Sequence, residues 1–86
     1  MERAEIVQAV NTSMSEGFEI PLENLTPQAH LFDDLKLDSL DAVDMMVHLE
    51  ERLNIKVDAE RFREVRHLGD VYNLITDIVT ESKTSH

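Results

Sequence analysis

The chain reads Leu35-Lys36-Leu37-Asp38-Ser39-Leu40-Asp41-Ala42-Val43-Asp44 near its middle. A single serine lies here between two aspartates, immediately before apolar residues at helical spacing. Asp38 and Asp41 stand three residues apart, so each carboxylate can accept a hydrogen bond from a free backbone N–H group at a helix start. The stretch therefore predicts a helix over about residues 39–53, with Asp38 as its N-cap and Asp41 at its third position.

Two interpretations of Ser39 follow from this stretch. If Asp38 is the N-cap, Ser39 is the first helical residue and its hydroxyl faces solvent, where a modifying enzyme can reach it. Serine is also among the best N-cap residues, and chemistry alone favours that purely structural role. A catalytic role is not expected, because Ser39 has carboxylate neighbours, no Gly-x-Ser-x-Gly elbow and no histidine close in sequence.

Length and charge limit the functional classes. The 86 residues predict one domain spanning 1–86, and the absence of cysteine excludes disulfides and thiolate metal sites. A formal net charge of −10 argues against nucleic acids and anionic membranes, which bind clustered Lys and Arg, and favours basic protein partners. No apolar run reaches the ~18 residues of a membrane span, and the first residues lack signal-peptide features. We expect a monomer in the cytoplasm.

The other helices are predicted from apolar spacing. The first covers residues 2–15 and ends near Gly17, the third is short and covers residues 59–65, and the fourth begins at His67 or Leu68. The apolar stripe of the second helix comprises Leu40, Val43, Met46, Val47, Leu49 and Leu53. That of the fourth comprises Leu68, Val71, Tyr72, Ile75, Ile78 and Val79.

A long connection, residues 16–37, separates the first two predicted helices. Its apolar side chains need burial, so it is expected to pack against the domain rather than act as a solvated linker. Residues 80–86 are polar and predict a flexible tail. The expected fold is all-α: a four-helix bundle with three long helices, one short helix and a long loop between helices one and two.

Several motifs resemble the acyl carrier protein family. They are Leu31-Phe32-Asp33-Asp34-Leu35, Leu37-Asp38-Ser39-Leu40-Asp41, Val43-Asp44, Leu49-Glu50-Glu51 and Leu68-Gly69-Asp70-Val71-Tyr72-Asn73-Leu74-Ile75. The tripeptide Asp-Ser-Leu is weak alone, but within this pattern and a chain of this size it is specific. The first helix and the long loop also fit, so the resemblance covers nearly the whole chain.

The resemblance implies that Ser39 carries 4′-phosphopantetheine, attached by a separate Mg²⁺-dependent phosphopantetheinyl transferase. The thiol of this arm would hold acyl groups as thioesters and present them to enzymes of fatty-acid, lipid or polyketide-type biosynthesis. The chain itself would not be an enzyme. On this reading Asp38 helps to hold the metal and substrate of the transferase, and Leu40 docks into partner pockets.

An acidic surface on the second helix is the expected docking site for enzymes with basic patches. Residues 33–51 contain seven acidic residues against one lysine, whereas an ordinary solvated surface would mix both signs. The predicted docking residues are Asp38, Leu40, Asp41, Asp44, Met45, Glu50 and Glu51. Residues 52–67 reverse the balance, with five basic against three acidic side chains. The family commonly has a more acidic third helix, so two interpretations of this departure are open: it marks specialised partners, or these basic side chains neutralise the acidic helix within the fold.

An acyl pocket between the second and third helices is also implied by the resemblance. The predicted lining is Val43, Met46, Leu49, Phe62, Val65 and Leu68, although each of these residues can equally be plain core. Phe62 replaces the small or aliphatic residue often found in the family. We therefore expect long acyl chains to be sequestered less well here than in a housekeeping carrier.

Three rival functions remain at the level of sequence. One is a carrier of aminoacyl or peptidyl groups, another is an acidic helical adaptor that is never modified, and the third is a small hydrolase, which lacks every supporting group. A metal centre is not expected. The four histidines are scattered, and the aspartates near Ser39 lack the glycine and ligand spacing of an EF-hand.

Overall fold

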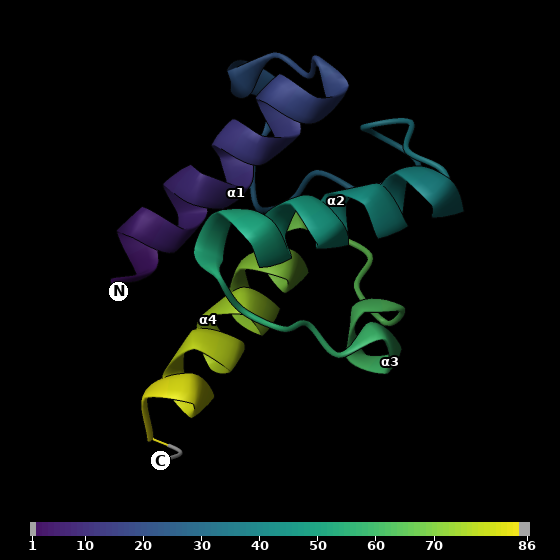
Figure 1. The fold of residues 1–86 in the computed structure, drawn as a ribbon. Coiled ribbons are helices and arrows are strands. Elements are labelled where there is room, and N and C mark those ends of the chain that lie inside the picture. Colours follow the sequence, from purple (N-terminus) through teal and green to yellow (C-terminus); the bar gives the residue numbers. More distant parts are fainter. Residues whose placement is uncertain (1, 85–86) are drawn as a thin grey trace.

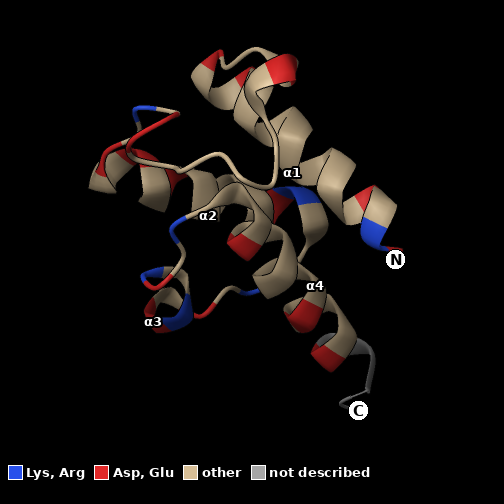
Figure 2. Ribbon diagram, turned by 180° about the vertical axis from the view of Figure 1, so that it is seen from behind, with Lys and Arg blue, Asp and Glu red and all other residues tan. Residues whose placement is uncertain are grey.

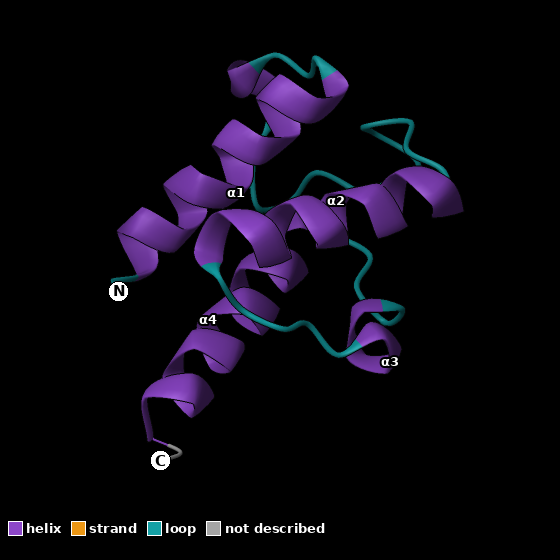
Figure 3. Ribbon diagram, in the orientation of Figure 1, coloured by secondary structure: helices purple, strands orange, loops and turns teal. Residues whose placement is uncertain are grey.

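The computed structural model describes residues 2–84, and its regular elements are helices joined by loops (Figures 1 and 3). Within that range the elements are α1 (Arg3–Phe18), the 3-10 helix η1 (Leu22–Asn24), α2 (Ser39–Leu53), α3 (Ala59–Phe62) and α4 (Leu68–Thr84). No strand occurs among these residues; the one β-bridge joins His30 and His67. The predicted all-α fold, with three long helices, one short helix and a long first loop, is confirmed.

The core forms where α1 packs against α2 and α4. Its most deeply buried side chains come from all three long helices and from the loop before α2: Ile6, Val10, Met14, Leu31, Met45, Leu49, Leu68, Val71 and Ile75. All six residues predicted for the apolar stripe of the fourth helix are buried. These long helices form one unit, whereas α3 lies at its side and contacts α4 (Figure 1).

Helix α1 continues beyond its predicted end. It runs to Phe18 and stops at Glu19, which adopts a left-handed conformation with φ 57°. Gly17, expected to end the helix because glycine favours that conformation, is an ordinary helical residue. The prediction was wrong because a non-glycine residue took the left-handed position.

The loop between α1 and α2 is fixed to the start of α4 by backbone hydrogen bonds. The N–H of Leu31 donates to the carbonyl of Arg66 (2.8 Å), and the N–H of Leu68 donates to that of Ala29 (2.9 Å). Apolar loop residues enter the core: Ile20, Leu25, Leu31 and Leu37 are buried. The loop is thus packed, as predicted, except that Leu22 is exposed.

Helix α4 begins with a carboxylate cap and extends further than predicted. Asp70 accepts hydrogen bonds from the backbone N–H groups of His67 and Arg66, both at 3.1 Å. These two bonds, that from His67 first, lower the pKa of the Asp70 carboxyl. The helix continues to Thr84, so residues 80–84, expected in the polar tail, are helical, and residues 85–86 lie outside the described range.

Helix α3 is shorter than the predicted 59–65. It ends at Phe62, and residues 63–65 continue as a turn in which the Val65 N–H donates to the Phe62 carbonyl (3.3 Å). Asp58 caps its start by accepting a hydrogen bond from the Glu60 N–H (2.9 Å). Phe62 and Val65 both face inward and are buried, as predicted.

Candidate functional site

The start of α2 exposes the Ser39 hydroxyl. The carboxylate of Asp38 accepts a hydrogen bond from the Asp41 N–H (2.9 Å), and the carboxylate of Asp41 accepts one from the Asp38 N–H (3.2 Å). This reciprocal pair completes the N-cap, so the alternative in which Ser39 itself caps the helix is wrong. Ser39 is exposed, and its hydroxyl has no hydrogen-bond partner in the described part of the chain.

An apolar cavity of about 470 Å³ opens beside Ser39, between the first half of α2 and α3. Its walls are Phe32, Ser39, Ala42, Val43, Met46, Ala59, Phe62, Arg63 and Val65. The α2 contributors are spaced at three and four residues, which puts them on one face of the helix. Ser39 therefore stands beside a largely apolar surface.

Four of the six predicted pocket residues line this cavity: Val43, Met46, Phe62 and Val65. Leu49 and Leu68 do not, because both are fully buried in the core of the long helices. Phe62 forms part of the wall and leaves the cavity open. The expectation of weaker sequestration of long chains stays a prediction.

Arg63 is a cavity residue that the sequence prediction missed. It lies directly after α3, in the wall opposite α2. The unusual basic balance of residues 52–67 was a signal, but it did not show which basic side chain reaches the cavity. Apart from Ser39, Arg63 is the only polar residue in the lining.

The solvent-facing side of α2 differs from the predicted one. Leu40, Val43 and Val47, expected to face the core, are 76%, 52% and 41% exposed. Met45, predicted as a docking residue, is 0% exposed and belongs to the core, so that assignment was wrong. Apolar residues surround much of α2, and their spacing alone did not identify the buried side.

The remaining predicted docking residues lie along α2 in different environments. Leu40, Asp44 and Glu51 are exposed at helical spacing and, with Val43 and Val47, form what we call the outer α2 face. Glu50 is partly buried, and its carboxylate accepts a hydrogen bond from the Val57 N–H at 2.8 Å. Glu50 therefore holds the segment between α2 and α3 in place.

Charge is distributed unevenly over the molecule. Figure 2 shows acidic segments around the start of α2, whereas the basic segments gather around α3 and the residues beside it. Arg61 pairs with Asp77 and Glu81 of α4, at 3.8 and 3.3 Å, so part of this basic charge is used within the fold.

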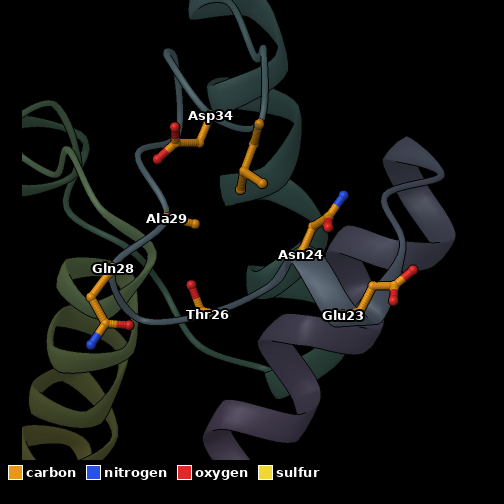
Figure 4. A pocket seen from close by; sticks show the side chains of 7 residues that line it. Glu23, Asn24, Thr26, Gln28, Ala29 and Asp34 are labelled. Atoms are coloured by element: carbon orange, nitrogen blue, oxygen red, sulfur yellow. The ribbon is translucent and has the colours of Figure 1, made fainter.

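A second cavity of about 460 Å³ lies in the loop before α2 (Figure 4). It is lined by Glu23, Asn24, Thr26, Gln28, Ala29, Asp34 and Leu35. None of these residues was predicted for attachment, docking or acyl binding. Its lining does not include Ser39.

Two kinds of feature are absent from residues 2–84. No helix there is long and apolar enough to cross a bilayer. No group of three or more His, Cys, Asp or Glu side chains is arranged there to hold a metal ion.

Known proteins similar to this chain share one family. The family described as "Phosphopantetheine attachment site" matches residues 8–75. The chain is 37% identical over 79 residues to acyl carrier protein 2 of Ralstonia nicotianae, covering 92% of this chain and 98% of that protein. It is 32% identical over 85 residues to the acyl carrier protein of Saccharopolyspora erythraea, covering 99% and 90%.

Solved structures show the same fold. The acyl carrier protein of Thermotoga maritima is similar with a TM-score of 0.81 and 22% identity, over 95% of each chain. That of Enterococcus faecalis is similar with a TM-score of 0.74 and 26% identity, over 91% of this chain and 99% of the other.

Proposed function

Because the chain belongs to the acyl carrier protein family, whose phosphopantetheine is carried covalently on a serine, we propose that Ser39 is the attachment serine. The protein is a carrier and not an enzyme. When bound, the arm supplies a thiol that holds the acyl group as a thioester. The chain's own residues display the serine, shelter the cargo and present a docking surface.

This proposal rests on one observation: Asp38 caps α2, whereas Ser39 takes no part in capping. Asp38 and Asp41 satisfy each other's backbone N–H groups at the helix start, and this leaves the Ser39 hydroxyl exposed. Ser39 also lines a largely apolar cavity, so the residues present fit a tethered acyl group. An adaptor that is never modified would need neither feature.

The outer α2 face is the surface on which we place the partner enzymes. Leu40 is the most exposed large apolar side chain of the described residues. Asp44 and Glu51 lie on the same outer α2 face. Basic patches on a phosphopantetheinyl transferase and on acyl-transferring or chain-modifying enzymes complement this combination. The basic segment around α3 favours a specialised fatty-acid, lipid or polyketide-type pathway. Residence in the cytoplasm and a monomeric state stay predictions from the sequence.

The test is intact mass after incubation with coenzyme A, Mg²⁺ and a promiscuous phosphopantetheinyl transferase. We expect one phosphopantetheinyl group on the wild-type protein and none on Ser39→Ala. Ser15→Ala, which removes a hydroxyl from α1, is the matched control and should be loaded like the wild type.

Loading of Ser39→Ala would move the attachment to another residue. A folded wild-type protein that gains no mass would leave the unmodified adaptor as the function that fits the acidic surface.

A further inference from the structure

The cavity beside Ser39 contains one charged group in an otherwise apolar lining. Seven of its nine residues are aliphatic, aromatic or methionine side chains, and Ser39 is the proposed attachment point. Arg63 is exposed, so it stands at the solvent-facing edge of the cavity and is the charged residue left to meet a cargo there. No acidic residue lines the cavity, so nothing in the lining repels an anion or neutralises the arginine.

Arg63 differs from every other arginine of the chain in its contacts. Within residues 2–81, whose side chains are described, its guanidinium makes no hydrogen bond or ion pair. The other four are engaged: Arg3 with Asn73 and Thr76, Arg52 with Glu16, Arg61 with Asp77 and Glu81, and Arg66 with the carbonyls of Arg63 and Val65.

Arg63 and Ser39 lie in different walls of the cavity. Arg63 follows α3 directly, so it stands in the wall that faces α2, whereas Ser39 begins α2. A carbon chain that lies along Val43, Met46 and Phe62 is covered by apolar surface, and the exposed Arg63 is the cation in the lining of the same cavity. Guanidinium groups bind carboxylates through two parallel hydrogen bonds, which makes a carboxylate the best-matched chain end.

We propose, on the basis of the function proposed for Ser39, that the cavity takes acyl groups ending in a carboxylate. The apolar walls hold the carbon chain, and the Arg63 guanidinium pairs with the terminal carboxylate. Such a site distinguishes a diacid half-thioester from a simple fatty acyl group of the same length. Arg63 thus acts as a specificity residue for the cargo.

The test compares cargoes of equal carbon count that differ in their end group. Glutaryl and valeryl, and the longer pair adipoyl and hexanoyl, are loaded from their coenzyme A thioesters by a promiscuous transferase and verified by intact mass. Thermal midpoints are then measured for the wild type, Arg63→Gln and Lys56→Gln. Lys56→Gln removes an exposed positive charge of the same segment that does not line the cavity.

In at least one pair, we expect the carboxylate cargo to raise the midpoint above its neutral partner by about 2–5 °C in the wild type. The difference should persist in Lys56→Gln, shrink at high salt and vanish in Arg63→Gln. Equal midpoints for both pairs in the wild type, or a difference that survives Arg63→Gln, would overturn the proposal.

The unacylated arm provides the decisive control, because its phosphodiester is also an anion. If Arg63→Gln lowers the midpoint of the unacylated, phosphopantetheinylated protein as much as that of the glutaryl form, the guanidinium binds the phosphodiester and the carboxylate assignment is wrong. Absence of any added mass is a different result: it refutes the attachment at Ser39 and, with it, a tethered cargo.

Discussion

Gly69 lies where the long loop packs closely against the start of α4. Its N–H donates to the Pro27 carbonyl at 3.0 Å, and a Cβ built on Gly69 would lie 3.1 Å from the same oxygen. The obstacle is backbone and cannot rotate away. Gly17, the other glycine, has space: its Cβ would meet only the His48 ring, at 3.7 Å.

The two glycines therefore predict opposite effects of the same substitution. Gly69→Ala should lower the free energy of unfolding by about 1 kcal/mol, because the loop must shift away from α4. Gly17→Ala should raise it by roughly 0.5–1 kcal/mol through the better helix propensity of alanine. Urea titrations of both variants measure the effects. A gain in stability for Gly69→Ala would show that the loop yields without cost.

At the scale of elements, capping chemistry decided which helix boundaries the sequence could predict. The predicted span of α2 is correct because Asp38 and Asp41 mark its start by local hydrogen bonds. The end of α1 was missed because Glu19 adopts a conformation usually left to glycine. That choice depends on how the following loop packs, which no local pattern records.

The sequence predicted the exposed position of Ser39 at the start of α2, but only part of the cavity walls beside it. Ser39 is marked by its flanking acids, and Val43, Met46, Phe62 and Val65 were found from apolar spacing. Spacing could not identify the buried side of α2, since apolar residues occur around much of that helix. Arg63 was missed because a charged residue in a turn carries no periodic signal.

The start of α4 predicts a pH dependence of stability. The pKa of Asp70 is lowered in the fold by the N–H groups of His67 and Arg66, below its ordinary 3.8. The stabilisation is therefore complete above about 3.8 and is lost as the pH falls through the lowered folded value. In Asp70→Asn this carboxylate contribution is absent at every pH.

Unfolding free energies of the wild type and Asp70→Asn between pH 2 and pH 6 measure this contribution. The wild type should be the more stable protein at pH 6, and its advantage should shrink below about pH 4. A constant gap across the range would mean that the carboxylate of Asp70 does not act through its charge.

Across the whole molecule, repulsion between the negatively charged side chains destabilises the compact folded state. The net charge of −10 is carried by a fold with a radius of gyration of 12.0 Å, and acidic residues occur on all its helices (Figure 2). Distances of this order are comparable to the ~10 Å Debye length in 0.1 M salt. Added salt therefore screens repulsion that acts across the molecule.

We expect the free energy of unfolding to rise by about 1 kcal/mol between roughly 10 mM and 500 mM NaCl. The double variant Asp44→Asn with Glu51→Gln, which removes two exposed charges of the outer α2 face, should be more stable at low salt and gain less from added salt. Denaturant midpoints measure both effects. Stability that falls as salt is added would show that attractive ion pairs dominate.

The two walls of the cavity differ in how strongly the stability of the fold depends on them. One wall is α2, whose adjoining side holds Met45 and Leu49 in the shared core, while the other is built around the four residues of α3. Mutations in the first wall therefore put the whole fold at risk, whereas exposed positions of the second can vary with little penalty. Related carriers can then diverge in cargo by drift in one short segment. A chimera that exchanges residues 59–64 alone would carry the preference of its donor.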